Sequence, residues 1–189
     1  GERIGMTSSG GMTTRWGWGR HAPVPDGGYI YGQRDLDADC TDPAPFTALA
    51  RELPREAVWV TSNLKRTIQT AAAIRGAAPG SHVAQAELAL PELAEQHLGE
   101  WQGQHRQQFL ASRDHALKGL WFAPSHEKAP GGESFDDLIA RVHASIRRLN
   151  QERQGRHIVA VTHGGTIRAA LALALGLEPD AAHAFTIEN

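Results

Sequence analysis

The chain has 189 residues, 41% of them hydrophobic, and a formal net charge of −2 at pH 7. This length suits one domain with a single core, and the near-neutral charge provides no basic surface for a nucleic acid or a membrane. The single cysteine, Cys40, excludes an intrachain disulfide and a cysteine-based zinc site, which favours a reducing, cytoplasmic location.

Residues 1–11 contain neither an initiator methionine nor the apolar core of a signal peptide. We therefore expect them to be a short non-native extension or a disordered N-terminus, and residues 12–189 to form the single domain. In the next stretch Trp16 and Trp18 alternate with Gly17 and Gly19, which predicts a strand with no side chains on its second face. Each interior glycine costs about 0.5–1 kcal/mol.

Proline and glycine are frequent in residues 22–42, which predicts a loop able to fold over a site. The pair Asp42-Pro43 is a typical helix start, and the helix is expected to continue to Leu53. Residues 57–61 are predicted to form a buried strand, and a helix with one apolar face is expected to follow, capped by Ser62.

In the second half, residues 82–86 are predicted to be a short strand, 88–103 an ordered loop and 105–117 a modest helix. The clearest helix is expected at 133–154, because apolar residues recur there at helical spacing. A buried strand at 157–162 and an apolar helix at 167–177 follow; that helix is about half the length of a membrane span. Residues 184–188 are expected to begin a last strand that continues past Asn189. This alternation predicts an α/β domain with a mostly parallel sheet and a ligand site beyond the carboxyl ends of its strands.

Three polar clusters follow predicted strands directly: Arg20-His21, residues 61–67 and residues 162–165. Because the carboxyl ends of parallel strands share one edge of a sheet, the three clusters are expected to converge. Arg66 falls in the first turns of a helix, where the backbone already carries partial positive charge, so it indicates an anion. A phosphoryl group would suit two guanidinium groups and a charged imidazole.

A neutral imidazole can attack phosphorus to form a phosphohistidine, while a carboxyl group protonates the leaving alkoxide. Glu95 is a candidate for this acid, with Glu92 and Glu100 as rivals. Taken singly, each element also has an ordinary explanation: a surface Arg-His pair, a histidine that caps a helix, or a solvated loop acid. No histidine pair or carboxylate cluster has the spacing of a metal site, so no metal or cofactor is expected.

Five segments of the chain together resemble the histidine phosphatase superfamily, also called phosphoglycerate-mutase-like. They are Arg20-His21, residues 62–71, residues 93–103, the Pro-Gly-Gly-Glu-Ser of 130–134, and the Thr-His-Gly-Gly of 162–165. The resemblance implies a three-layer α/β/α fold with a mostly parallel central sheet. It is strongest for a phosphatase branch similar to α-ribazole phosphatases.

The resemblance also implies roles for individual residues. His21 would be the phosphorylated nucleophile, with Arg20 and Arg66 as phosphate ligands. Glu95 would be the proton donor, chosen over its rivals by alignment on a neighbouring glycine. His163 would donate to the phosphoryl group, and both it and Gly164 would belong to the phosphate-binding set.

The chain departs from the family pattern at three places: Ala22 replaces a signature glycine, Gly17 and Gly19 replace bulky residues, and the edge strand with which the family's sheet usually continues past Asn189 is missing or lies outside the given sequence. The short connection 103–129 favours hydrolysis of a small phosphorylated metabolite, with inorganic phosphate as product, over mutase activity. A phosphoryl-binding module without turnover is the remaining alternative. Several side chains in the loops are candidates for contact with the leaving group: Tyr29, Tyr31, Arg34, Arg106, Arg113 and Trp121.

Overall fold

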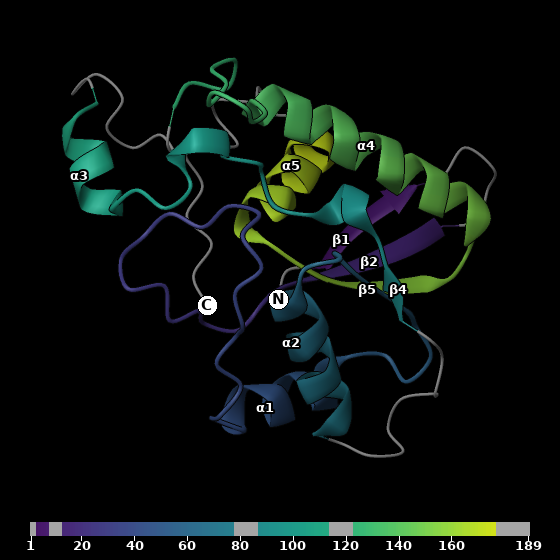
Figure 1. Ribbon diagram of the computed structural model, residues 1–189. Helices are drawn as coiled ribbons and strands as arrows, with labels where there is room; N and C mark the ends of the chain where they lie inside the picture. Colours follow the sequence, from purple (N-terminus) through teal and green to yellow (C-terminus); the bar gives the residue numbers. More distant parts are fainter. Residues whose placement is uncertain (1–2, 8–12, 78–86, 114–122, 177–189) are drawn as a thin grey trace.

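The computed structural model describes residues 3–7, 13–77, 87–113 and 123–176, which form helices around a five-stranded sheet (Figure 1). The strand order is β1-β2-β5-β3-β4. Strand β1 pairs antiparallel with β2, and the other neighbours are parallel. The strands are β1 (Arg3–Thr7), β2 (Thr13–Arg20), β3 (Val58–Thr61), β4 (Leu88–Ala89) and β5 (His157–Thr162). The helices are α1 (Ala44–Glu52), α2 (Lys65–Gly76), α3 (Arg106–Ala111), α4 (Phe135–Glu152) and α5 (Gly164–Leu175), with short 3₁₀ turns η1 (Pro91–Leu93) and η2 (Gly99–Trp101).

The register of the parallel strands brings three strand ends to one edge of the sheet. Arg20 lies opposite Thr162 across β2 and β5, and Thr61 lies opposite Val161 across β3 and β5. The predicted convergence of the polar clusters at the carboxyl ends of these strands is therefore confirmed.

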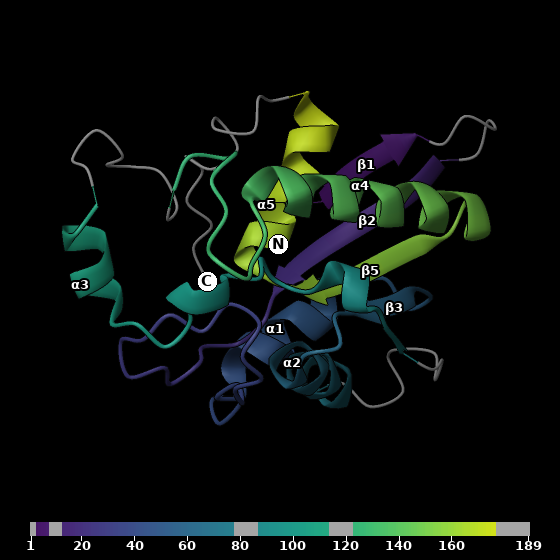
Figure 2. The ribbon, with the colours of Figure 1, turned by 45° about the horizontal axis from the view of Figure 1, so that its top comes forward.

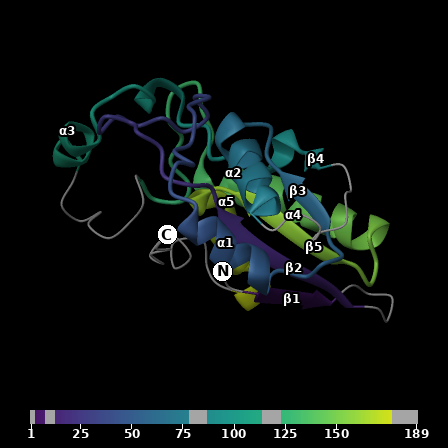
Figure 3. The same cartoon turned by 90° about the horizontal axis from the view of Figure 1, so that it is seen from below.

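Helices cover both faces of the sheet, as Figures 2 and 3 show from two sides. On one face, α4 and α5 pack against Trp16, Trp18 and Ile158 through an apolar cluster that includes Leu138 and Ile146. On the other face, α1 and α2 pack against β3 and β5 through a second cluster. The three-layer α/β/α arrangement is confirmed.

Helix α4 is the longest of the described helices, and its sequence explains both its start and its packing. The Ser134 hydroxyl accepts a hydrogen bond from the Asp137 backbone at 3.1 Å, and the Asp137 carboxylate accepts one from the Ser134 backbone at 3.0 Å. This reciprocal capping box satisfies two backbone donors that a helix start would leave unpaired. Near its other end, Asn150 accepts a 2.8 Å hydrogen bond from the buried Trp16 indole.

Part of the N-terminal segment, expected to be a non-native extension or disordered, forms a strand. Arg3–Thr7 forms β1 and pairs with β2 from Arg3 opposite Gly17 to Thr7 opposite Thr13. A strand at this edge satisfies backbone groups of β2 that would otherwise remain unpaired, so these residues belong to the sheet. Residues 8–11 lie outside the described residues.

Other boundaries also shift. The pair Leu88–Ala89, predicted to lie in a loop, forms β4, while the predicted strands at 82–86 and 184–188 lie outside the described residues. Helix α3 ends at Ala111, well before the predicted residue 117, and α5 begins at Gly164, before the predicted residue 167. None of the described helices combines the length and the apolar character needed to cross a bilayer.

The glycines of β2 lie where the sheet has little cover. Gly17 and Gly19 are partly exposed. A methyl group added to Gly17 would meet no atom within 4 Å, and one added to Gly19 would meet only the Ala160 carbonyl, at 4.0 Å. Strand β2 is therefore buried on its tryptophan face and open on the other, so it does not need an apolar residue at every position.

Candidate active site

His21 directly follows β2, and its ring is held in one tautomer. Its backbone N–H donates to Thr162 at 3.0 Å, and its Nδ1 lies 2.7 Å from the Ala22 carbonyl oxygen. A carbonyl oxygen can only accept, so Nδ1 carries the proton and Nε2 keeps its lone pair in the neutral ring. Burial, aided by the charges of Arg66 and Arg20, lowers the pKa of His21 from 6.5 to about 4, although the hydrogen bond to Ala22 acts in the opposite direction. The ring is therefore neutral at neutral pH.

Ala22, which replaces the glycine of the family signature, packs away from the site. Its side chain joins the apolar cluster under α1 and α2 together with Phe46 and Ala50. Its backbone N–H donates to the Thr70 hydroxyl at 2.8 Å. The extra methyl group is accommodated in the core and does not line the active-site pocket.

Arg66 enters the site from the first turn of α2 and is completely buried. Its two terminal nitrogens donate to backbone carbonyls of the preceding loop, at 2.7 Å to Arg34 and 2.5 Å to Gly32. Its Nε has no hydrogen-bond partner among the described residues. Burial lowers the pKa of the guanidinium, while the nearby Glu95 carboxylate acts in the opposite direction.

His163 directly follows β5, immediately before α5, and is also completely buried. Its Nε2 lies 2.8 Å from the Ser62 hydroxyl, and its ring meets His21 edge-on at 5.3 Å between centroids. Its Nδ1 has no partner among the described residues. Burial, followed by the charge of Arg66, lowers the pKa of His163 well below 6.5. This low pKa favours a neutral ring, in contrast to the charged imidazole expected from the sequence.

Glu95 is the one of the three candidate acids that lines the pocket. Its Oε1 accepts from the Gln96 backbone at 3.0 Å, and its Oε2 accepts from the Gly165 backbone at 3.1 Å. The rival Glu92 instead forms an ion pair with Arg148, and Glu100 is exposed. Of the three, Glu95 alone is placed for chemistry on a ligand in this pocket.

The approach of Glu95 to helix α5 depends on the second glycine of the Thr-His-Gly-Gly segment. A methyl group on Gly165 would lie 3.1 Å from the Glu95 Cδ and closer still to its Oε1. The neighbouring Gly164, assigned to phosphate binding by the resemblance, lies beside Arg20: a methyl group there would be 3.7 Å from the Arg20 Nε.

Arg141, on α4, holds the irregular segment that carries Glu95. Its guanidinium donates to the backbone carbonyls of Glu92 at 2.8 Å, Ala94 at 2.9 Å and Glu95 at 3.2 Å, and to the Glu133 carboxylate at 2.5 Å. Sequence reasoning missed this residue. The one signal in the sequence is that this cationic residue stands next to Val142, a buried residue on the apolar face of the helix.

The Pro-Gly-Gly-Glu-Ser segment completes this support by crossing the segment after Glu95 at close range. The Glu133 carboxylate accepts from the His97 backbone at 2.9 Å. Gly99 adopts a φ of +46°, and a methyl group on it would lie 2.7 Å from the Gly132 nitrogen. The two glycine-containing segments therefore fit together because neither has a side chain at the crossing.

A third arginine, Arg168, was also missed. It is 6% exposed on α5, five residues after His163. Burial lowers its pKa, and the charges of Glu95 and Arg20 act on it in opposite directions. Arg168 does not line the pocket, so it acts on the site through its charge and not through contact with a ligand in the pocket.

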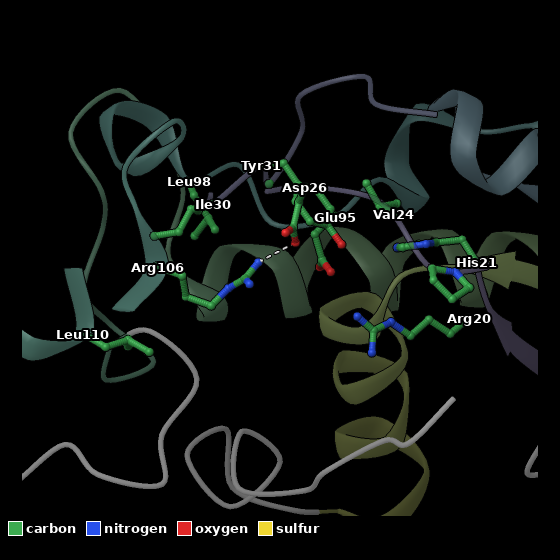
Figure 4. A pocket seen from close by; sticks show the side chains of 12 residues that line it. Arg20, His21, Val24, Asp26, Ile30, Tyr31, Glu95, Leu98, Arg106 and Leu110 are labelled. Carbon is green, nitrogen blue, oxygen red and sulfur yellow. Dashed lines mark hydrogen bonds and ion pairs between the residues drawn. The ribbon is translucent and has the colours of Figure 1, made fainter. Parts of the chain in front are cut away.

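The pocket in front of these residues has a volume of about 480 Å³. Figure 4 shows Arg20 and His21 at one end, with Ile30, Leu98 and Leu110 at the other. Arg66 and His163 do not line it, because they are fully buried. Among the described residues, no group of three or more His, Cys, Asp or Glu side chains is placed to hold a metal ion.

The site contains a set of buried donors whose hydrogen bonds are not made. Within the described part of the chain, Arg20 Nε, Arg66 Nε and His163 Nδ1 have no partner. A buried polar group left unpaired costs about 1–3 kcal/mol, and cationic donors cost more. An anion bound between the three strand ends would satisfy them, and a phosphoryl group has the required charge and acceptor oxygens.

These features describe a candidate anion-binding site on an α/β scaffold, and comparison with known proteins identifies the family. The model of the histidine phosphatase superfamily (branch 1) matches residues 27–189, and the chain belongs to this superfamily. The matched residues begin after His21, so the assignment of Arg20 and His21 rests on their geometry and on the resemblance of their motif.

Two curated relatives come from Arabidopsis thaliana. A metal-independent phosphoserine phosphatase is 30% identical over 147 residues, which cover 75% of this chain and 60% of the relative. Phosphoglycerate mutase-like protein 4 is 36% identical over 144 residues, which cover 74% of this chain and 61% of the relative. This chain thus spans about 60% of the length of these two relatives. The native structure of a mycobacterial glucosyl-3-phosphoglycerate phosphatase matches with a TM-score of 0.72 at 27% identity, covering 88% of this chain and 82% of that one.

Proposed function

We propose that the protein is a metal-independent phosphomonoester hydrolase that acts on a small phosphorylated metabolite through a phosphohistidine intermediate. The observation that supports this most strongly is the His21 ring. Its Nδ1 is bound to the Ala22 carbonyl and its Nε2 is left as a neutral nucleophile, beside three buried donors that lack partners. Such an arrangement suits attack on a bound anion.

In the first step, the Nε2 lone pair of His21 attacks phosphorus and the bond to the leaving oxygen breaks. Glu95 transfers a proton to that oxygen, so the alcohol departs neutral and the phosphoryl group stays on Nε2. In the second step, Glu95 removes a proton from water, the resulting oxygen attacks phosphorus, and the bond to Nε2 breaks. Inorganic phosphate leaves, and His21 and protonated Glu95 are regenerated.

The remaining residues stabilise charge on the transferring group. Arg20, the Nε of Arg66 and the first turn of α5 at Gly164 would face its equatorial oxygens, where stabilisation is most effective in phosphoryl transfer. If the Ser62 hydroxyl donates to Nε2 of His163, the neutral ring carries its proton on Nδ1 and donates to the phosphoryl group without being charged.

The relatives include proteins named as phosphatases and one named as mutase-like, so both outcomes require a test. The short connection between Gly103 and Ala129 favours hydrolysis. Rapid interconversion of 2- and 3-phosphoglycerate with little phosphate release would support the mutase instead.

The decisive assay measures phosphate release from p-nitrophenyl phosphate in the presence of EDTA. We expect His21→Ala to lose at least about 10³-fold in activity, since it removes the nucleophile. The exposed His126 provides a matched control, and His126→Ala should be unaffected. Quenched turnover with labelled substrate should give an acid-labile phosphoenzyme that His21→Ala lacks. Full activity of His21→Ala would refute the mechanism, and binding of phosphate without turnover by the parent would support a binding module.

A further inference from the structure

The pocket extends well beyond the groups that would handle a phosphoryl group. Its volume of about 480 Å³ lies in the range typical of sites for whole small molecules, about 300–1,000 Å³, whereas a phosphoryl group has only a few heavy atoms. The additional lining comes from the loop after β2, from the turn before η2 and from α3 (Figure 4). This extra space is where the leaving group of a phosphomonoester would lie.

The side chains that line this space are mainly apolar: Pro23, Val24, Ile30, Leu98 and Leu110. Ile30 and Leu98 are almost fully buried and form a fixed wall. Leu110 is 43% exposed, one of the four large hydrophobic side chains exposed in the described residues. Ligand contact would remove its apolar surface from water, which is favourable at about 25 cal/mol per Å².

The charged groups of this part of the pocket neutralise each other. Arg106 lies 3.0 Å from the Asp26 carboxylate, and Figure 4 shows this ion pair between the two ends of the pocket. The other Asp26 oxygen accepts from the Gly28 backbone at 2.7 Å, which fixes the carboxylate in place. The same Arg106 nitrogen also reaches the Tyr29 carbonyl at 3.4 Å. The wall therefore offers no net charge to a ligand.

We propose that this region is a leaving-group subsite that selects phosphomonoesters of apolar alcohols or phenols, with roughly four or more carbon atoms and no second charge. The proposal rests on the proposed function for the identity of the phosphoryl end. It differs from what the names of the relatives suggest for them, because phosphoserine and phosphoglycerate are small, polar and charged beyond the phosphate.

Binding of alkylphosphonates tests the subsite without requiring turnover, because their P–C bond is not hydrolysed. Calorimetric affinities should be measured from methylphosphonate to hexylphosphonate. Each methylene that becomes buried contributes about 0.8 kcal/mol, or about fourfold, so we expect the Kd to fall two- to fourfold per carbon. Leu110→Ser should reduce this slope clearly. The matched control is Leu175→Ser, at an exposed leucine on α5 outside the pocket, and it should leave the slope unchanged.

A charged analogue separates the proposal from its main rival, in which Arg106 binds a carboxylate of the substrate. The probe is 3-phosphonopropionate, compared with butylphosphonate. We expect butylphosphonate to bind at least tenfold more tightly. Tighter binding of the carboxylate, lost in Arg106→Gln, would overturn the proposal, and so would an alkyl series with no slope.

Turnover of methyl and hexyl phosphate distinguishes the two hypotheses. Normal hydrolysis of both esters with a flat phosphonate series would reject the subsite and keep the hydrolase. A sloped phosphonate series without any hydrolysis would keep the subsite and reject the hydrolase.

Discussion

Substituting Gly165 by alanine tests whether Glu95 acts as the proton donor from the position seen in the structure. The added methyl group would lie 3.1 Å from the Glu95 Cδ and closer to Oε1, so the carboxylate must move. The 3.1 Å hydrogen bond from the Gly165 backbone to Oε2 would be lost with it. General acid–base catalysis contributes about 10²–10⁴-fold, and we expect Gly165→Ala to lose about 10²-fold on an alkyl phosphate, or about 2.7 kcal/mol of transition-state stabilisation.

The leaving group of the substrate separates this effect from general damage. The p-nitrophenolate ion departs without being protonated, so kcat/KM for p-nitrophenyl phosphate, which reports the first step alone, should change by less than about threefold, whereas kcat/KM for butyl phosphate should fall. The matched control is Gly76→Ala in α2, where an added methyl group meets no atom within 4 Å. Equal losses on both substrates would show that the nucleophile is disturbed. No loss on either substrate would show that Glu95 does not have to occupy the position seen in the structure.

Three further predictions concern stability. Because the pKa of His21 falls from 6.5 to about 4 on folding, the unfolded chain binds the proton between these pH values, and stability should fall as the pH drops through this window. In His21→Asn this loss should be smaller by on the order of 3 kcal/mol, measured as the difference between the free energies of unfolding at pH 7 and pH 4 in chemical denaturation. An unchanged pH dependence in this variant would contradict the low pKa. Asn150→Leu should cost about 1–3 kcal/mol by leaving the buried Trp16 indole without its acceptor, and a neutral result would show that the indole finds another partner. Ser134→Ala removes the cap of α4 and should cost about 1 kcal/mol, whereas Ser134→Asp should retain stability; equal losses in both variants would argue against the cap.

The fold and the members of the site were accessible from the sequence because their signals are local. A buried strand followed by a polar cluster and a helix start is a pattern within about 15 residues, and parallel strands place such clusters on one edge. The predicted residues Arg20, His21, Arg66, Glu95 and His163 lie close enough together for charges among them to shift the pKa values of His21, Arg66 and His163.

What the sequence did not reveal depends on contacts between distant segments. Arg141 is 46 residues from Glu95, and its role comes from the docking of α4 against a segment without regular structure. The charge state of His163 follows from its complete burial among arginines, which no motif encodes. The short β4 has too few residues to show any alternation, and β1 is defined by its pairing with β2, which its own sequence pattern does not show.

The way Arg141 holds its segment has a consequence for how the protein would inactivate. Three of the carbonyls of residues 92–95 accept hydrogen bonds from one guanidinium of α4, and the Gln33 amide and the Thr166 hydroxyl add one each, to Glu95 and Ala94. We therefore expect this segment not to unfold while α4 stays docked. Its release would leave the Arg141 guanidinium, which is paired with the Glu133 carboxylate, without its hydrogen-bond partners in the segment. On heating, loss of the proposed proton donor Glu95 and loss of the α4 layer should occur as one event, so the temperature of half-activity and that of half-unfolding should coincide.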